Sequence, residues 1–204
     1  LIIASSDDQV CVMDKLTYSA NRKSLKDFEN KPGFEFIKGD ICDRKGVKAA
    51  IRGVDVVVNF AAEVAVDRSI RDPESFLRTD IFGVYTLLDE LRQSKGLKKF
   101  IQISTDEVYG QIKTGSFSET SELKPRNPYA ASKAGGEHLA YSFFETYQMP
   151  VIMTRACNTY GPQAYPEKVI PLFITNLIDD LPVPVYGEGR QIRDWVFVDD
   201  HCRA

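Results

Sequence analysis

The stretch VDVVVNF, residues 54–60, is almost purely β-branched and decides the fold class. A continuous run of this kind predicts a strand that is buried on both faces of a sheet. Shorter apolar runs repeat the pattern, and they predict further strands at residues 10–14, 34–37, 100–104 and 151–154.

Two helical patterns lie between these strands. From Pro73 to Ser94 the apolar residues recur with a period close to 3.6. Asn127 and Pro128 are a favoured N-cap residue and a favoured first residue, so they predict a second helix that runs to about Gln148. Strands that alternate with helices through short connections pair in parallel with right-handed crossovers. The sequence therefore predicts an α/β fold, a doubly wound parallel sheet of the Rossmann type.

The composition of the sequence changes after residue 156, where prolines become frequent. We therefore expect a dinucleotide-binding domain over residues 1–156 and the start of a smaller, truncated C-terminal substrate lobe over 157–204. No glycine precedes Gly33, and the sequence does not begin with Met. We expect an internal fragment of a longer protein, in which the first strand and the glycine-rich phosphate loop lie upstream of Leu1.

The composition is that of a globular protein, with 43% hydrophobic and 27% charged residues among 204. A formal net charge of -3 gives no indication of the basic surface that nucleic-acid binding requires. No apolar run approaches the roughly 18 residues of a membrane span. The four cysteines form no CxxC pair and there are two histidines, so we expect no metal site. Scattered single cysteines suit a reducing, cytoplasmic location.

Two aspartates close predicted strands. Asp14 ends the first strand, where a dinucleotide-binding fold places the carboxylate that holds a ribose hydroxyl. A carboxylate there repels a 2′-phosphate, so it favours NAD over NADP. Asp40 ends the next strand and fits a contact near the adenine. The alternative, a solvated aspartate at a strand end, stays open for both positions.

Tyr129 and Lys133 share one face of the second predicted helix, because they are four residues apart. An ammonium beside a phenol lowers the phenol pKa, and such a tyrosine can take a proton from a sugar hydroxyl as hydride leaves the same carbon. The alternative is an ordinary surface pair. Gly135 and Gly136 follow in the same helix, and they predict the close approach of another backbone there.

Two adjacent carboxylates, Asp106 and Glu107, follow Thr105 at the end of a predicted buried strand. Ligands of open α/β sheets bind at such strand ends, and neighbouring carboxylates in a closed site have pKa values that are pushed apart, which gives one acid and one base. The alternative is a solvated turn. Arg193 could clamp a diphosphate with two hydrogen bonds, or form an ion pair with Asp194.

Together these segments resemble the extended short-chain dehydrogenases/reductases, and among them closely the dTDP-glucose 4,6-dehydratases. The matching segments follow the family's order along nearly the whole chain: DKLTY at 14–18, GDI at 39–41, NFAAE at 59–63, VDRS at 66–69, STDEVYG at 104–110, YAASK at 129–133, NTYGP at 158–162, PEKVIP at 166–171, PVYG at 184–187 and RDW at 193–195. The Thr-Asp-Glu triplet separates dehydratases from sugar-nucleotide epimerases, whose strand end usually reads Ser-Ser. Val64 and Ala65 depart from the family's Ser and His, and the Ser position touches substrate in the family.

The resemblance implies a role for each catalytic residue. Tyr129, with Lys133, removes the O4 proton while hydride passes from C4 to NAD, and Thr105 hydrogen-bonds O4. Glu107 then takes the C5 proton and Asp106 protonates the departing C6 hydroxyl. Return of the hydride to C6 leaves dTDP-4-dehydro-6-deoxyglucose.

The resemblance also implies binding residues and partners. Besides Tyr129 and Lys133, the positions that match the cofactor site are Asp14, Lys15, Leu16, Thr17, Asp40, Ile41, Phe60, Ala61, Ala62 and Thr79. Besides Thr105, those that match the site of the nucleotide-diphospho-sugar are Asn158, Lys168, Val169, Pro184, Val185, Tyr186 and Arg193. The two long helices, paired between two subunits, imply a homodimer through a four-helix bundle. The alternatives are an NDP-sugar 4-epimerase, a dehydratase of another NDP-sugar, and a non-catalytic Rossmann module that senses dinucleotide.

Overall fold

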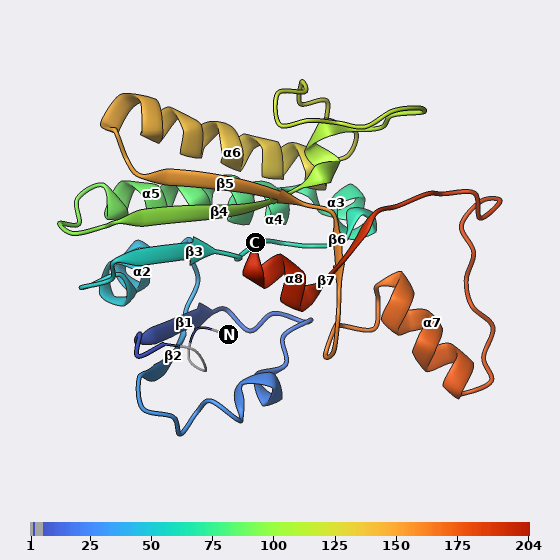
Figure 1. The fold of residues 1–204 in the computed structure, drawn as a ribbon, viewed down its shortest axis with the longest axis horizontal. Helices are drawn as coiled ribbons and strands as arrows, with labels where there is room; N and C mark the ends of the chain where they lie inside the picture. Colours follow the sequence, from blue (N-terminus) through green and yellow to red (C-terminus); the bar gives the residue numbers. More distant parts are fainter. Residues whose placement is uncertain (1, 3–5) are drawn as a thin grey trace. The chain divides into compact units, whose positions relative to one another are not determined.

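The computed structural model describes residue 2 and residues 6–204 (Figure 1). These residues divide into two compact units, which we describe separately. The larger unit comprises Val10–Lys15 and Glu35–Ala156, and the smaller comprises Leu16–Phe34, Cys157–Ala204 and the described part of Leu1–Gln9. Leu1 and residues 3–5, where the predicted dinucleotide-binding domain begins, lie outside the described residues. The predicted domain boundary after residue 156 stays a prediction.

The larger unit alternates strands and helices along the chain, as the sequence predicts. Its elements are β1 (Val10–Asp14), β2 (Phe34–Lys38), α2 (Arg44–Ala50), β3 (Val56–Asn59), α3 (Val66–Arg71), α4 (Pro73–Leu77), η2 (Arg78–Gly83), α5 (Val84–Leu91), β4 (Lys99–Thr105), η3 (Asp106–Tyr109), α6 (Pro128–Tyr147) and β5 (Val151–Ala156). Each predicted strand is present, although β3 is shorter than its β-branched run.

Three strands of the larger unit form one parallel sheet in the order β3-β4-β5. Val58 lies beside Ile101, and Ile101 lies beside Ile152. Because the strands are parallel, their carboxyl ends meet at one edge of the sheet, where Thr105 pairs with Ala156. β1 and β2 pair in a separate two-stranded sheet.

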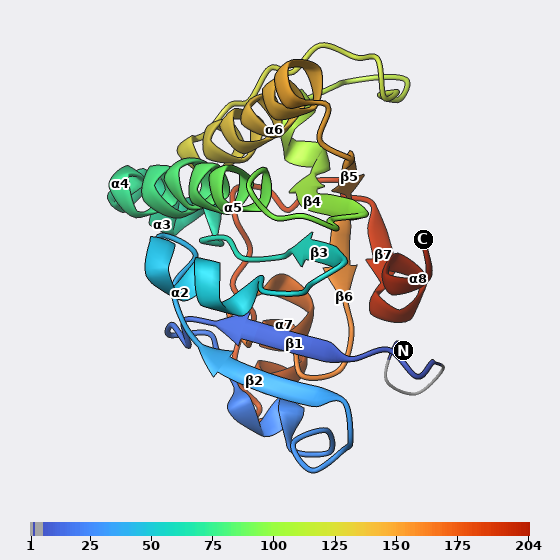
Figure 2. The ribbon, with the colours of Figure 1, turned by 90° about the vertical axis from the view of Figure 1, so that its left-hand side faces the viewer.

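The core of the larger unit lies between β4 and the helices. Phe100 of β4, Leu88 and Leu91 of α5, Val47 of α2 and Ala140 of α6 are all at most 1% exposed and belong to one cluster. Figure 2 shows α2, α5 and α6 along one side of β3, β4 and β5. Burying this apolar surface is the main favourable term for the unit.

The expectation that the 54–60 strand is buried on both faces is wrong. Val57 packs against the core, but Val56 and Val58 are 44% and 38% exposed. Successive side chains of a strand point to opposite faces, so Val56 and Val58 share the face away from the core cluster. The β-branched run identifies a strand correctly, but composition cannot tell which elements cover each face.

The first predicted long helix is interrupted. α4, η2 and α5 follow one another from Pro73 to Leu91, and the middle segment η2 is a π-helix. The helix ends three residues before Ser94. A π segment inserts one extra residue into the turn, and it changes which side chains face α6.

The second predicted helix is confirmed as α6. The Asn127 side chain accepts a hydrogen bond from the Ala130 amide at 2.8 Å, Pro128 occupies the first turn, and Gln148 caps the other end in the left-handed region at φ 55°. The close approach predicted at the glycine pair is also confirmed, because a Cβ on Gly136 would lie 2.5 Å from the carbonyl oxygen of Asp80.

The smaller unit contains η1 (Arg22–Leu25), β6 (Asn158–Tyr160), α7 (Val169–Ile178), β7 (Trp195–Phe197) and α8 (Val198–Arg203). β6 and β7 are parallel, and the ring of Tyr160 packs against those of Trp195 and Phe197. The Tyr18 hydroxyl donates to Glu167 Oε1 at 2.8 Å, which joins the segment after β1 to the segment before α7.

Two chemical features concern the whole described chain. All four cysteines are free. Among the described residues, no helix is both long and apolar enough to cross a membrane, and no three His, Cys, Asp or Glu side chains gather as a metal site.

Candidate active site

The carboxyl end of β4 carries the predicted acids on one short turn. Thr105 is the last residue of β4 and the N-cap of η3. Its hydroxyl accepts a hydrogen bond from the Glu107 amide at 3.3 Å and lies 3.2 Å from Asp106 Oδ1. One hydroxyl thus fixes the start of the turn and holds the Asp106 carboxylate beside the strand end.

Asn127 ties this turn to α6. Its side-chain oxygen caps the helix, and its Nδ2 donates to Glu107 Oε2 at 3.1 Å. The base candidate is therefore held at the first turn of the helix that carries Tyr129. The sequence indicated Asn127 only as a helix cap, so its contact with Glu107 is a site feature that the sequence reasoning missed. The signal in the sequence was that an asparagine cap has a second polar group, its side-chain NH₂, which capping does not use.

Tyr129 is largely enclosed and packs edge-on against Phe76, with ring centroids 6.2 Å apart. Burial raises the pKa of the Tyr129 phenol, the charge of Glu107 raises it further, and a hydrogen bond with Thr105 acts in the opposite direction. The expectation that this pKa is lowered is therefore wrong for this structure. The dominant effect is the loss of solvent around the phenolate, and the negative charges of Glu107, Asp80 and Asp106 add to it.

Lys133 is 6% exposed, and its ammonium donates to the Ile103 carbonyl oxygen at 2.8 Å. Burial lowers the pKa of Lys133, while the charges of Asp80 and Glu137 oppose that shift. α6 therefore places a phenol and a buried ammonium one turn apart, and the ammonium is anchored on the backbone of β4.

The two carboxyl groups differ in their surroundings. Burial raises the pKa of Asp106, and the neighbouring charge of Glu107 raises it further, against a hydrogen bond from Thr105. This direction favours the protonated form that a general acid needs. Glu107 keeps one carboxylate oxygen on the Asn127 amide.

The predicted cofactor residues are divided between the units. In the larger unit Lys15 Nζ lies 2.8 Å from Asp40 Oδ2, and the other Asp40 oxygen accepts from the Cys42 amide at 2.9 Å. Asp14 is exposed at the end of β1, and Phe60, at the end of β3, is 61% exposed. The remaining predicted positions of this unit are Ile41, Ala61, Ala62 and Thr79, whereas Leu16 and Thr17 belong to the smaller unit.

The predicted substrate residues other than Thr105 all belong to the smaller unit. Asn158 begins β6 and donates to the Asp194 carbonyl oxygen at 3.3 Å, and Lys168 is the N-cap residue of α7. Arg193 is exposed, and its Nη1 donates to its neighbour's carbonyl oxygen at 2.7 Å. The other positions are Val169, Pro184, Val185 and Tyr186, of which the last two are 59% and 73% exposed.

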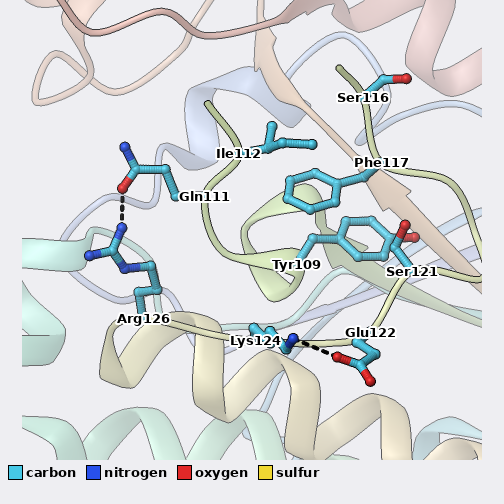
Figure 3. Close-up of a pocket in the computed structure, with 9 residues that line it drawn as sticks. All are labelled: Tyr109, Gln111, Ile112, Ser116, Phe117, Ser121, Glu122, Lys124 and Arg126. Atoms are coloured by element: carbon cyan, nitrogen blue, oxygen red, sulfur yellow. Dashed lines mark hydrogen bonds and ion pairs between the residues drawn. The ribbon is translucent and has the colours of Figure 1, made fainter. Parts of the chain in front are cut away.

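A separate cavity of about 610 Å³ lies in the loop that follows η3 (Figure 3). The stacked rings of Tyr109 and Phe117 form one side of it, with centroids 5.1 Å apart, and Lys124 pairs with Glu122 at 2.6 Å. None of the five predicted catalytic side chains is among the residues that line it. We therefore assign the candidate site to the strand end and not to this cavity.

A family model described as GDP-mannose 4,6 dehydratase matches residues 2–204. The chain belongs to this family. The dTDP-glucose 4,6-dehydratase of an Actinoplanes species is 49% identical over 197 residues, which are 96% of this chain and 61% of that protein. The low-salt glycan biosynthesis protein Agl12 of Haloferax volcanii is 45% identical over 203 residues, which are 100% of this chain and 65% of that protein.

Solved structures agree with the family assignment. DesIV, a dTDP-glucose 4,6-dehydratase from Streptomyces venezuelae solved with NAD bound, superposes with a TM-score of 0.94 at 47% identity. The match covers 98% of this chain and 62% of that one. UDP-glucuronic acid 4-epimerase from Bacillus cereus superposes with a TM-score of 0.90 at 30% identity, covering 96% of this chain and 63% of that one. The predicted Rossmann-type α/β fold is thus confirmed, and the chain spans about three fifths of the length of these relatives.

Proposed function

We propose that this member of the GDP-mannose 4,6 dehydratase family contributes the catalytic centre of a dTDP-glucose 4,6-dehydratase. The observation that carries the proposal is the pair Asp106 and Glu107 on η3, tied through Asn127 to the helix of Tyr129 and Lys133. A reaction limited to hydride transfer at C4 does not require two further carboxyl groups at the same strand end. A dehydratase needs one to take a proton and one to give a proton.

The cofactor fits the donor set of the larger unit. Carboxylates at the ends of β1 and β2, Asp14 and Asp40, suit the ribose hydroxyls and the adenine of NAD, and the exposed ring of Phe60 offers apolar surface at the end of β3. Asp14 also disfavours a 2′-phosphate. When bound, NAD supplies a hydride acceptor that can return the hydride later.

In the proposed reaction Tyr129 takes the O4 proton of the sugar while Thr105 holds O4 by a hydrogen bond. Lys133, a buried cation, stabilises the phenolate that this step requires. The resulting 4-keto group makes the C5 proton acidic. Glu107 removes that proton, and Asp106 protonates the C6 hydroxyl as it leaves as water. The C5–C6 double bond would then take the hydride back at C6 and the proton of Glu107 at C5, which gives the 4-keto-6-deoxy sugar.

The surroundings of the two carboxyl groups indicate which one is the acid and which one is the base. Asp106 has a raised pKa and can hold the proton that the leaving hydroxyl needs. Glu107 accepts a hydrogen bond from the neutral amide of Asn127, which orients the carboxylate without neutralising it. We infer from these differences that Glu107 is the base and Asp106 is the acid.

The test compares Glu107→Gln with Glu119→Gln in the full-length protein. Glutamine keeps the shape and the contact with Asn127 but cannot accept the C5 proton, so product formation should fall by about 100-fold or more. Reduced nicotinamide should still appear in a single turnover with dTDP-glucose. Glu119 is an exposed acid of the following loop, and its substitution should change neither signal.

The outcomes separate the rival functions. A 4-keto-6-deoxy product, seen by its ultraviolet absorbance in alkali, supports a dehydratase. Interconversion at C4 without that product supports an epimerase, and binding of NAD without turnover of any nucleotide sugar supports a dinucleotide sensor. Unchanged dehydration by Glu107→Gln would refute the assignment of the base.

We also propose a homodimer through the outward faces of η2, α5 and α6. Each of these elements exposes aromatic side chains: Phe82, Tyr85, Tyr141, Phe144 and Tyr147 are 36–52% exposed. Exposed aromatic side chains on neighbouring helices favour association, and paired helices from two subunits would form a four-helix bundle. Free cysteines and the nucleotide-sugar substrate class support a cytoplasmic location.

A further inference from the structure

The π-helical segment η2 carries an aspartate that the proposed reaction does not use. Asp80 is 2% exposed, and its Oδ2 accepts a hydrogen bond from the Ser132 hydroxyl at 2.7 Å. Its other oxygen, Oδ1, is buried and makes no hydrogen bond of normal geometry, although a backbone hydrogen bond from Glu63 lowers the pKa of this carboxyl group. Burying a carboxyl group is costly even when it has hydrogen-bond donors, so the position needs an explanation beyond packing.

The backbone brings this carboxyl group onto the active-site helix. The Asp80 carbonyl approaches α6 so closely that only a glycine fits at position 136. Ser132 directly precedes Lys133, and its hydroxyl lies 2.7 Å from Asp80 Oδ2 and 2.8 Å from the Tyr129 carbonyl oxygen, so these two acceptors share its single proton. Asp80 therefore lies against the turn of α6 that joins the phenol to the ammonium.

The charge of Asp80 acts on both members of that pair. It opposes the effect of burial on the pKa of Lys133, and it adds to burial and to Glu107 in raising the pKa of Tyr129. Both effects have the same sign, because a nearby negative charge favours the protonated form of any group.

We propose that Asp80 is a positioning residue that sets the pH window in which Tyr129 and Lys133 work as a pair. Its buried negative charge keeps Lys133 protonated to higher pH and delays formation of the Tyr129 phenolate. The kinetic part of this statement rests on the proposed function, whereas the effect on Lys133 does not.

Several charged groups surround Asp80 and determine when it is ionised. Lys133 and Tyr129 come from α6, and Glu63 comes from the segment after β3; Glu137 of α6 acts on Lys133. Burial raises the pKa of Asp80 to about 6, against the Lys133 charge and the hydrogen bonds from the Ser132 hydroxyl and the Glu63 backbone. Asp80 should therefore lose its charge as the pH falls through about 6.

The experiment is Asp80→Asn in the full-length protein, followed by NMR of lysine labelled at Cε. Asparagine keeps the shape and can still accept from Ser132, but it carries no charge. The midpoint of the Lys133 titration should move to lower pH by about one unit or more. In steady-state assays with dTDP-glucose, both limbs of the pH profile should move the same way.

Asp89→Asn is the matched control. Asp89 is a 9% exposed aspartate of α5, and its partners are Arg44 and Arg92, not Lys133. Its substitution should leave the Lys133 midpoint unchanged. If Asp80→Asn fails to fold, the wild-type Lys133 signal should still show a second step near pH 6, where Asp80 titrates.

An unchanged midpoint in Asp80→Asn, or the absence of the second step in the wild-type protein, would overturn the inference. If Lys133 shifts but the full-length protein dehydrates no nucleotide sugar, the proposed function fails and the charge coupling stands. If dehydration occurs but the midpoint of the Lys133 titration does not move, the proposed function stands and the charge coupling fails.

Discussion

Arg155 on β5 offers a sharp test of how the active-site turn is held in place. Its guanidinium donates to Glu137 Oε2 through Nε at 2.9 Å and through Nη2 at 2.6 Å, and Glu137 is only 2% exposed. Nη1 donates to the Tyr109 hydroxyl at 2.7 Å and to the Glu119 carbonyl oxygen at 3.2 Å. One side chain therefore joins β5, α6, the end of η3 and the loop that follows it.

Replacing Arg155 by Met should cost about 3–5 kcal/mol of unfolding free energy, the usual result when one partner of a buried ion pair is removed. The loss arises because the Glu137 carboxylate stays buried without the cation that forms hydrogen bonds to it. Urea unfolding of the full-length protein would measure it. Arg190→Met is the control, because its pair with Glu188 is exposed on both sides and should contribute nothing measurable.

A double variant isolates the cause. Arg155→Met combined with Glu137→Leu removes both charges and fills the space with apolar atoms, so it should recover most of the lost stability. If the double variant is as unstable as the sum of the single variants, the buried charge is not the source of the loss. A cost below about 1 kcal/mol for Arg155→Met alone would refute the reasoning at its first step.

The other predictions concern binding, packing and assembly. Arg193→Ala should weaken binding of a dTDP-sugar by about 1.5–3 kcal/mol in calorimetry and leave the cofactor spectrum unchanged. Tyr129→Phe should abolish hydride transfer and keep binding of the sugar nucleotide. The opposite pattern would contradict the division of roles between these residues. Gly136→Ala should destabilise the fold by about 1–3 kcal/mol in urea unfolding, because a new Cβ meets backbone, while Gly135→Ala should cost less because it meets only the movable end of Ile81. Phe144→Glu should convert a full-length dimer into monomers by light scattering, and a wild-type monomer would exclude the proposed interface.

The sequence reveals those parts of the site that are local in the chain. Thr105, Asp106 and Glu107 are consecutive, and Tyr129 and Lys133 are one helical turn apart, so spacing alone predicts which side chains share an element. The cap at Asn127 is predicted for the same reason, since a side chain that bonds an amide three residues away leaves a local signature.

What the sequence does not reveal depends on contacts between distant elements. The π segment at Asp80 keeps an apolar pattern that reads as a regular helix, because one extra residue changes the period too little to detect. Arg155 and Glu137 belong to different elements, and the sequence around each residue does not indicate that the two form an ion pair. The exposure of Val56 and Val58 depends on what covers the sheet, which no property of a single strand determines.

The double role of Asn127 limits which residues can be tolerated at that position. Aspartate would cap α6 equally well, but its second oxygen would face Glu107 with the same charge instead of an N–H group. Serine would cap the helix and leave Glu107 without its amide donor. Cap preferences alone rank these three residues as near equals. A library of variants selected for folding should therefore accept all three, and one selected for turnover should retain asparagine alone.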